Sequence, residues 1–264
     1  MRAAKEPILS VAILVILAMV CIAAGIIGPE GAMEMDFGYL LSPPSAKHIL
    51  GTDQLGRDMF KMALYGGRVS LLIGTMASFI TAAIAVVYGA AAGLAPKHID
   101  NFLMRLIDLF MSIPTILYII SIQAALGKPT VLSLSIVIGA TSWMGIAKIT
   151  RAEVRQMHKG EYILAAQLMG ASPIYILWRH LLPNFMPSIM PMLIHNFSHA
   201  IASEATLSFL GLGMPPGTAT WGTLMSLSQE ALLTNSWWVI AAPSIFLIIA
   251  LICITNIGEY FRGK

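Results

Sequence analysis

The sequence predicts an all-α, polytopic membrane protein. Of the 264 residues, 57% are hydrophobic and only 11% are charged, whereas ordinary soluble domains carry roughly 25% charged residues. Several stretches without Lys, Arg, Asp or Glu are long enough to cross a bilayer, which takes about 20 helical residues. A soluble domain of this composition could not cover itself with polar side chains, so a water-soluble fold is excluded.

Six such stretches predict six transmembrane helices. The first follows Arg2 and Lys5 and begins like a signal peptide, but its uncharged length exceeds the usual core of about 7–15 residues. It is therefore interpreted as a retained span. The fifth stretch is the least hydrophobic, because it contains two prolines and two histidines. The expected spans are Ile8–Ile27, Val69–Ala95, Leu109–Leu126, Val131–Ala147, Phe185–Ser203 and Val239–Gly258.

The basic residues predict how these spans are oriented. With the N-terminus inside, eleven of the sixteen Lys and Arg residues fall in cytoplasmic segments and five fall outside, and basic loops favour the cytoplasmic side. We therefore expect both termini in the cytoplasm. Residues 1–68 would form the first span with a long extracytoplasmic loop, and residues 69–264 a five-helix core.

A polar segment between the fourth and fifth spans, at about residues 152–183, is expected on the cytoplasmic side. It contains EYILAAQLMGASPIYILWRHLLP. A short helix is expected from Glu161 to Met169, with its acid at the electropositive N-terminus. Gly170 suits the left-handed residue that ends a helix, and Pro173 suits the first position of the next one. The segment is predicted to be two short helices around a glycine turn.

The pattern E-Y-x-x-A-A-x-x-x-G followed by H-L-L-P resembles the EAA loop of ABC-importer permeases. Two further stretches, HILGTDQLGRDMF (His48–Phe60) and LSFLGLGMPPGTATWG (Leu207–Gly222), resemble the C-type subunits of the dipeptide, oligopeptide and nickel importers. Together the three stretches extend the resemblance over most of the chain. The resemblance implies the type I ABC-importer permease fold, in the cytoplasmic (inner) membrane of a prokaryote.

The resemblance also implies partners and coupling residues. The EAA loop would dock on a cytoplasmic ATPase subunit through Glu161, Ala165, Ala166, Gly170 and Pro183. The complex would contain a homologous second permease, two ATPase subunits and an extracytoplasmic substrate-binding protein. ATP and Mg²⁺ would be used by the ATPase partners, so this chain is expected to bind no cofactor.

The outer segment GTDQLGRDMFKMALYGGR alternates acidic and basic residues with apolar ones. Such a pattern is typical of an amphipathic helix lying at a membrane surface. Asp53, Arg57 and Asp58 are candidates for contact with the binding protein or for part of an outer gate. A solvated cap over the second span is the alternative interpretation.

Candidate translocation-path residues lie in and after the fifth span. His195 and His199 are one helical turn apart, and polar residues inside a membrane usually face the bundle interior or a cavity. Their spacing could hold a metal, but no carboxylate or thiol shares their stripe, so pore-facing or packing histidines are favoured. Glu204 would contact a cationic group in the path or anchor the outer end of the span. Gly211 and Gly213 indicate irregular backbone, which would line the external mouth of the path or form an ordered loop.

A membrane-embedded enzyme and a self-sufficient channel are the competing functions. The chain contains neither H-E-x-x-H nor G-x-S-x-G, the motifs that would indicate metalloprotease or serine-hydrolase chemistry. The stretch LGKPT has Ile122 where a phosphate-binding loop requires its first glycine. A channel would leave the EAA loop without a purpose. The expected function is a non-catalytic permease subunit that carries di- or oligopeptides; nickel or a nickel chelate is the alternative, with His195 and His199 as ligands.

Overall fold

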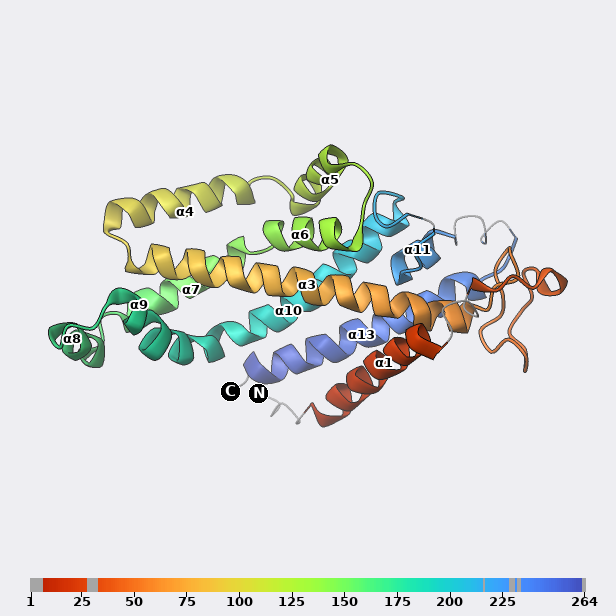
Figure 1. Ribbon diagram of the computed structural model, residues 1–264, viewed down its shortest axis with the longest axis horizontal. Coiled ribbons are helices and arrows are strands. Elements are labelled where there is room, and N and C mark those ends of the chain that lie inside the picture. The colour runs from red at the N-terminus through yellow and green to blue at the C-terminus, as the bar shows by residue number, and fades with distance from the viewer. Residues whose placement is uncertain (1–6, 28–32, 216, 228–230, 232–233, 263–264) are drawn as a thin grey trace.

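The computed structural model describes the chain except for residues 1–6, 28–32, 216, 228–230, 232–233 and 263–264. Its regular elements are helices (Figure 1). In chain order they are α1 (Ile8–Ile27), η1 (Phe37–Tyr39), α3 (Met59–Leu94), α4 (Lys97–Met111), α5 (Thr115–Leu126), α6 (Val131–Thr141), α7 (Met144–Met157), α8 (Glu161–Leu168), α9 (Pro173–Ile176), η2 (Leu177–Leu181), α10 (Leu182–Phe209), α11 (Trp221–Ser226) and α13 (Trp238–Arg262).

Helices α3 and α10 form the centre of the bundle (Figure 1). They pack on each other, α3 also contacts α1, α6 and α7, and α10 also contacts α11 and α13. Small residues permit the closest approaches. A Cβ atom on Gly89 of α3 would lie 2.6 Å from the Ala147 carbonyl oxygen of α7. Backbone contact of this kind is how helices associate when lipid supplies no hydrophobic driving force between them.

Among the described residues, two helices are by themselves long and apolar enough to cross a membrane, α3 and α13. The count rises to four if each of two bent helix pairs is one span. Helix α1 has the bounds that the sequence predicts, and α10 includes the whole predicted fifth span. The coarse prediction of an all-helical membrane protein is confirmed, whereas six spans stay a prediction.

The predicted third and fourth spans each coincide with part of a bent helix pair. The range Leu109–Leu126 covers the end of α4 and all of α5, and the two helices are bent by 83° relative to each other. The range Val131–Ala147 covers α6 and the beginning of α7, which are bent by 48°. Pro114 lies at the first break and disfavours helical backbone at the residue before it. At the second break the Ser142 hydroxyl donates to the Ile138 carbonyl (2.8 Å), a local bond that bends helices.

The second span begins at Met59, ten residues before the expected Val69. The Asp58 carboxylate caps this helix by accepting from the backbone N–H groups of Phe60 (2.9 Å) and Lys61 (3.1 Å). The expected amphipathic surface helix is therefore wrong. Its first half is a loop and its second half is the beginning of α3, so the boundary placed at residue 68 falls inside one continuous helix.

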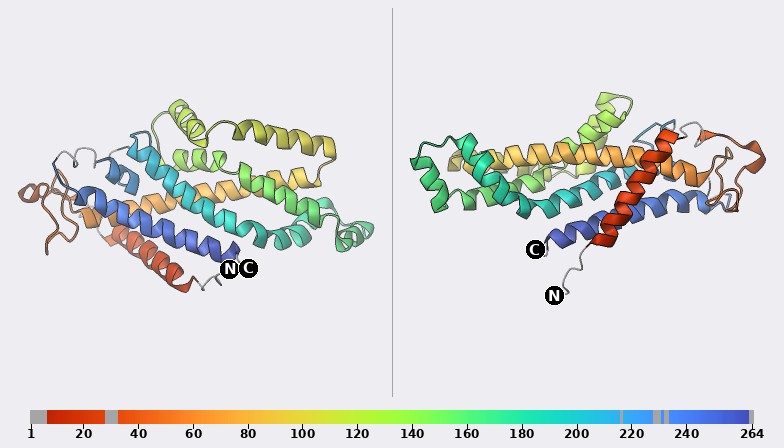
Figure 2. Two further views of the ribbon diagram at one scale, coloured as in Figure 1. Left: turned by 180° about the vertical axis from the view of Figure 1, so that it is seen from behind. Right: turned by 60° about the horizontal axis from the view of Figure 1, so that its bottom comes forward.

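The two ends of the long axis carry different segments (Figures 1 and 2). Helices α8 and α9 lie at one end, and the loop that precedes α3 lies at the other. The start of α1 lies beside the end of α13, where the Asn256 amide donates to the Ser10 hydroxyl (3.4 Å). The described chain thus begins and ends on one side of the bundle; the termini themselves, residues 1–6 and 263–264, lie outside the described residues.

Candidate coupling loop and translocation path

The predicted helix–glycine–helix turn is confirmed. Helix α8 ends at Leu168, and Gly170 has a φ of 82°. The Ala171 N–H donates back to the Ala166 carbonyl (3.0 Å), and the Ser172 hydroxyl caps α9. A Cβ atom on Gly170 would have no neighbour within 4 Å. Glycine is therefore needed at this position for its left-handed backbone, not for space.

One face of the loop is buried against the bundle. Ile163 and Ala166 of α8 belong to a hydrophobic cluster with Ala90 of α3, Val154 of α7 and Phe185 of α10. Ile163 and Phe185 are fully buried. The cluster therefore contains residues near the ends of α3, α7 and α10, and α8 shares a core with all three helices.

The other face of the loop exposes large apolar side chains. Leu168 is 89% exposed, Met169 82%, Ile174 71% and Trp178 66%. We call these four residues the apolar patch. Ala165 is also exposed, and Glu161 lies exposed in the first turn of α8. Large apolar side chains exposed in a loop are typical of a contact surface for another protein.

A π-helical turn, η2, connects the loop to α10, and the sequence did not predict it. The Leu182 N–H donates to the Leu177 carbonyl, five residues back. Pro183 follows at once. A proline ring in a helix collides with the carbonyl four residues earlier, here that of Arg179, and the wider π turn relieves this contact. The Asn184 amide donates to the His180 carbonyl (2.7 Å).

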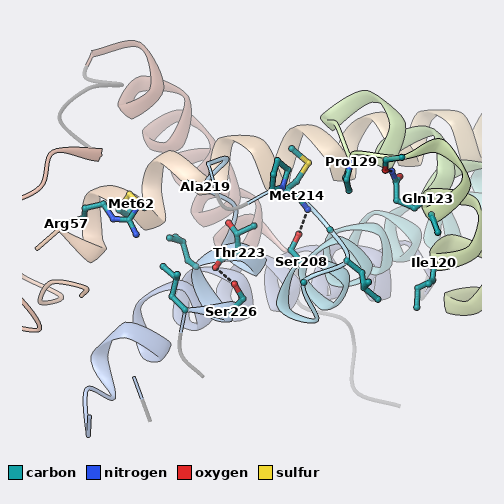
Figure 3. Close-up of a pocket in the computed structure, with 18 residues that line it drawn as sticks. Arg57, Met62, Ile120, Gln123, Pro129, Ser208, Met214, Ala219, Thr223 and Ser226 are labelled. Atoms are coloured by element: carbon teal, nitrogen blue, oxygen red, sulfur yellow. Dashed lines mark hydrogen bonds between the residues drawn. The ribbon is translucent and has the colours of Figure 1, made fainter. Parts of the chain in front are cut away.

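Three cavities follow the face of α10 that is turned toward the bent helix pairs. The outer cavity, of about 400 Å³, contains Gln123 of α5, Ser208 of α10 and the Gly211–Pro215 segment (Figure 3). The middle cavity, of about 220 Å³, lies between α5 and α10. The inner cavity, of about 320 Å³, lies where both helix pairs bend. Since Thr115 and His199 line both the middle and the inner cavity, these two are adjacent.

The outer cavity brings together residues that the sequence considered separately. Gly211 and Gly213 line it, and so does Arg57 from the loop before α3. Gly211 has a φ of 75°. A Cβ atom on Gly213 would lie 2.2 Å from the Ser208 hydroxyl oxygen. The irregular backbone expected here is therefore present, and it lines a cavity.

His195 and His199 both line the inner cavity. His195 Nε2 lies 3.5 Å from Glu259 Oε1 of α13, and the same oxygen lies 3.2 Å from Arg262 Nη1. Sequence spacing could not have found Glu259, which is far along the chain. Within the described part of the chain, no group of three or more His, Cys, Asp or Glu side chains could hold a metal ion.

Glu204 is fully buried. Its carboxylate accepts hydrogen bonds from Ser70 of α3 (3.0 Å) and Ser208 of α10 (2.8 Å). The Ser70 hydroxyl in turn accepts from the backbone N–H of Trp221 in α11 (3.1 Å). This arrangement joins three helices at the outer end of the bundle, which fits the anchoring alternative better than contact with a passing cation.

The charged candidates of the loop that precedes α3, here called the outer loop, are turned inward. Asp53 is only 2% exposed and accepts from Arg57 Nε (2.7 Å) and Nη2 (2.6 Å). Asp58 caps α3 and also pairs with His48 Nδ1 (2.9 Å). The loop is further held to α13, because the Trp238 indole N–H donates to the Thr52 carbonyl (3.0 Å). These acidic and basic groups stabilise the loop from within.

The outer loop exposes apolar residues instead. Phe37 is 70% exposed, Ile49 63%, and the neighbouring Trp237 61%. A surface ion pair lies among them, where Lys47 Nζ approaches Asp36 Oδ2 at 3.1 Å. That hydrogen bond holds the pKa of the Asp36 carboxyl below its usual value.

A second ionic cluster was not found by sequence reasoning. Asp100 of α4 is fully buried and accepts hydrogen bonds from Arg151 and Arg155 of α7. The Arg151 Nε–Asp100 Oδ1 distance is 2.7 Å. The positive-inside pattern counted both arginines among the cytoplasmic residues. The partner acid lies 51 residues away, so only the fold reveals that the cluster ties α4 to α7.

Comparison with known proteins decides the family. Residues 85–263 match the family described as binding-protein-dependent transport system inner membrane component. The chain belongs to this family. It is a transport permease of the inner membrane and is not itself catalytic.

Curated relatives are similar over most of the permease. It is 33% identical over 247 residues to the dipeptide transport system permease protein DppC of Bacillus subtilis (strain 168), covering 94% of this chain and 77% of that protein. It is 36% identical over 220 residues to the oligopeptide transport system permease protein OppC of the same organism, covering 83% and 72%. The di/tripeptide transport system permease protein DppC of Pseudomonas aeruginosa (strain UCBPP-PA14) is 32% identical over 242 residues, covering 89% and 79%.

The fold of the permease also occurs in a solved ABC transporter. A chain of the MetNI methionine ABC transporter, determined in inward-facing conformations, matches with a TM-score of 0.62. The match covers 77% of this chain and 96% of that chain at 17% sequence identity. Likeness at this identity establishes a shared fold.

Proposed function

We propose that the permease forms half of the translocation path of an ATP-driven importer of di- or oligopeptides. The observation that carries the proposal is that α8 shares one hydrophobic cluster with α10, and that residues further along α10 line the three cavities. The relatives named DppC and OppC support peptides as the substrate. Nickel or a nickel chelate is the alternative substrate.

In this proposal the α8–α9 loop is the coupling element. The apolar patch would enter a groove of a cytoplasmic ATPase subunit, where burying each large side chain contributes about 1.5–3 kcal/mol. The small exposed side chain of Ala165 lets the helix approach the ATPase closely, Ala166 packs on the bundle, and Glu161 begins the helix. The cluster around Ile163 and Phe185 would carry the movement of the ATPase to α3, α7 and α10.

The complex would contain four further chains. A second, homologous permease would complete the path, two ATPase subunits would hydrolyse ATP with Mg²⁺, and a binding protein would deliver substrate from outside. The path would open alternately to each side as nucleotide and loaded binding protein shift the populations of two conformations. Gly211, Gly213, His195 and His199 would line it, since each lines one of the cavities along α10.

We also infer the topology. Six spans result when α1, α3, α10 and α13 count singly and each bent pair counts once. The α8–α9 loop would be cytoplasmic and the loop before α3 extracytoplasmic, which agrees with their positions at opposite ends of the bundle (Figure 1). Both termini would be cytoplasmic, in agreement with the contact of Ser10 with Asn256.

The test is uptake by the complete complex in proteoliposomes, with a labelled di- to pentapeptide mixture compared with radioactive nickel. We expect ATP-dependent peptide uptake that Leu168→Asp abolishes. Gln167→Asp is the matched control, because it adds the same charge at an exposed neighbouring position without removing apolar surface. Nickel uptake without peptide uptake would select the alternative substrate, and full uptake by Leu168→Asp would refute the coupling role.

A further inference from the structure

A groove lies between helices α1 and α3. The two helices touch where a Cβ atom on Gly67 of α3 would lie 2.7 Å from the Cys21 Sγ atom of α1, and α1 lies obliquely across the bundle (Figure 2). Beside this contact they leave a groove of about 440 Å³, here called the α1–α3 groove. The residues that line it include Ala18 and Ile22 of α1, Leu71 and Leu72 of α3, and Phe197 of α10.

The wall of the α1–α3 groove is hydrocarbon. Among the described residues that line it, all are apolar except Arg68 and Thr75. The Thr75 hydroxyl donates to the Leu71 carbonyl of its own helix (2.7 Å), so its hydrogen-bonding group is satisfied within α3. Ile22 is 51% exposed and Leu72 48%, so the groove is open at the surface of the bundle. A polar occupant would bury its hydrogen-bonding groups unpaired there, which is costly, and the wall therefore suits a hydrocarbon chain.

Arg68 marks one end of the groove. It is the last charged residue before the uncharged stretch Val69–Ala95, which begins on the extracytoplasmic side in the proposed topology. Its guanidinium carbon lies 4.9 Å from the centre of the Tyr65 ring, which is nearly one turn closer to the start of α3. The cation is thus directed toward the membrane surface, as basic side chains near the ends of spans are. At a rise of about 1.5 Å per residue, Thr75 lies about 10 Å deeper.

We propose that the α1–α3 groove holds an anionic phospholipid of the outer leaflet. One acyl chain would lie between α1 and α3 against Phe197, and the Arg68 guanidinium would pair with the phosphate. A guanidinium has five N–H donors and binds phosphate through two of them, so it can do this beside its contact with Tyr65. A phospholipid has the matching distribution of chemistry, with its phosphate at the membrane surface and hydrocarbon directly beneath. The bound lipid would fill the gap between α1 and the rest of the bundle.

A helix of the second permease would fit this groove less well. The groove of about 440 Å³ has less room than a single helical turn, which occupies about 500 Å³ at a pitch of about 5.4 Å and a diameter of about 11 Å. Such a helix would also have to place an acid opposite Arg68 at the level of the lipid phosphates. A hydrocarbon chain is narrower than a helix and brings its own phosphate.

The first measurement is the binding of phosphatidylglycerol to the purified complex in detergent, titrated by native mass spectrometry. We expect the wild type to bind this lipid. Arg68→Gln removes the charge and should weaken binding about tenfold, since hydrogen bonds to charged groups are among the strongest. Ala18→Phe places a ring inside the groove and should displace the acyl chain, with a loss at least as large.

The second measurement locates the lipid. A photoreactive amino acid replaces Leu72, which lines the groove and is about half exposed, and the complex is illuminated in vesicles of equal parts phosphatidylglycerol and phosphatidylcholine. The photoreactive side chain should cross-link to phosphatidylglycerol. Adding Ala18→Phe should remove most of that product.

Each substitution has a matched control. Lys61→Gln removes the same charge from an exposed position of α3, and Ala12→Phe adds the same ring at an exposed position of α1; neither residue lines the groove. Both should bind lipid like the wild type. Stimulation of ATP hydrolysis by loaded binding protein reports whether each complex is assembled. If Arg68→Gln fails to assemble, Ala18→Phe decides.

Three results would overturn the lipid site. The first is wild-type lipid binding by assembled Arg68→Gln and Ala18→Phe complexes. The second is an equal loss in Arg68→Gln and Lys61→Gln, which would indicate a general effect of surface charge. The third is a cross-link from position 72 to the second permease in place of lipid, which would make a helix the occupant. Because neither measurement uses a transported substrate, the peptide importer stands or falls separately.

Discussion

The two ends of the bundle use their characteristic residues in opposite ways. At the α8–α9 end, Gly170 and Ala166 shape the backbone and bury one face, and the apolar patch is left exposed. At the other end, internal hydrogen bonds and ion pairs involve Asp53, Arg57 and Asp58. Apolar side chains such as Phe37 are exposed there. At both ends the residues of the sequence motifs hold the segment in its conformation, and their apolar neighbours in sequence are exposed.

This comparison teaches that a recurring motif does not by itself mark a contact. The charges of GTDQLGRD suggested a polar surface for the binding protein. The structure uses them to fix a loop whose exposed residues include large apolar side chains such as Phe37 and Ile49. We therefore expect changes at motif residues to alter shape or stability, and changes at their exposed neighbours to alter association.

The largest effect on transport is expected from Gly170→Val. A β-branched residue is strained at a φ of 82°, and the left-handed conformation costs a non-glycine residue about 1–2 kcal/mol or more. The α8–α9 turn should open and displace the apolar patch. Most of the stimulation of ATP hydrolysis by loaded binding protein should disappear, while membrane insertion stays normal. Asn tolerates this conformation, so Gly170→Asn should retain much of the stimulation. Unchanged transport by Gly170→Val would refute the role of the turn.

The next effect is expected from Asp53→Ala. The change leaves the Arg57 guanidinium, only 13% exposed, without its partner, and breaking a buried pair costs about 3–5 kcal/mol. Thermal unfolding of the purified complex should shift to lower temperature. Glu34→Ala, at an exposed acid of the same loop, should leave it unchanged. Weaker association with the binding protein at unaltered stability would instead make Asp53 a contact residue.

A smaller effect is expected from Ile49→Asp. Ile49 is 63% exposed, so the fold should tolerate the charge. Losing an apolar contact in an interface costs roughly 1 kcal/mol or more, about fivefold in affinity. Titration of ATP hydrolysis with loaded binding protein should show this weakening. Ala46→Asp adds the same charge at an exposed position nearby and removes little apolar surface, so its titration should match the wild type. Equal weakening by both variants would indicate a charge effect.

The smallest effect is expected from Glu204→Gln. A glutamine keeps hydrogen-bonding capacity toward Ser70 and Ser208, so stability should change by less than about 1 kcal/mol. Glu204→Leu leaves both hydroxyls without a hydrogen-bond acceptor and should lower the free energy of unfolding by about 1–3 kcal/mol. Both variants are compared by thermal unfolding and by peptide uptake. If Glu204→Gln lost uptake without losing stability, Glu204 would be a residue of the translocation path and not an anchor.

The sequence was most informative where the cause of a structure is local. Uncharged length predicted α1 residue by residue, and Gly170 with Ser172-Pro173 predicted the turn between α8 and α9. Hydropathy did not predict the bend of the third span at Pro114, because a bend does not interrupt the run of apolar residues. It also placed the start of α3 too late, because the cap at Asp58 lies in a polar stretch.

Long-range polar contacts lay beyond the sequence. Glu204 was correctly noticed as an unusual acid, but its partner Ser70 is 134 residues away. The same holds for Asp100 with Arg151 and for His195 with Glu259. Each polar group was visible in the chain, yet which one it meets depends on how the helices pack.

The bond from Trp238 to Thr52 has a consequence for biosynthesis. A chain is made from its N-terminus, and domains assemble as their parts emerge. Thr52 precedes the second helix of the bundle, whereas Trp238 opens the last one. The outer loop is thus synthesised early but cannot adopt its final contacts until α13 has been made. A permease truncated before Trp238 would lack the hydrogen bond from Trp238 to Thr52, so its outer loop could not reach the final structure even if the α8–α9 loop had folded.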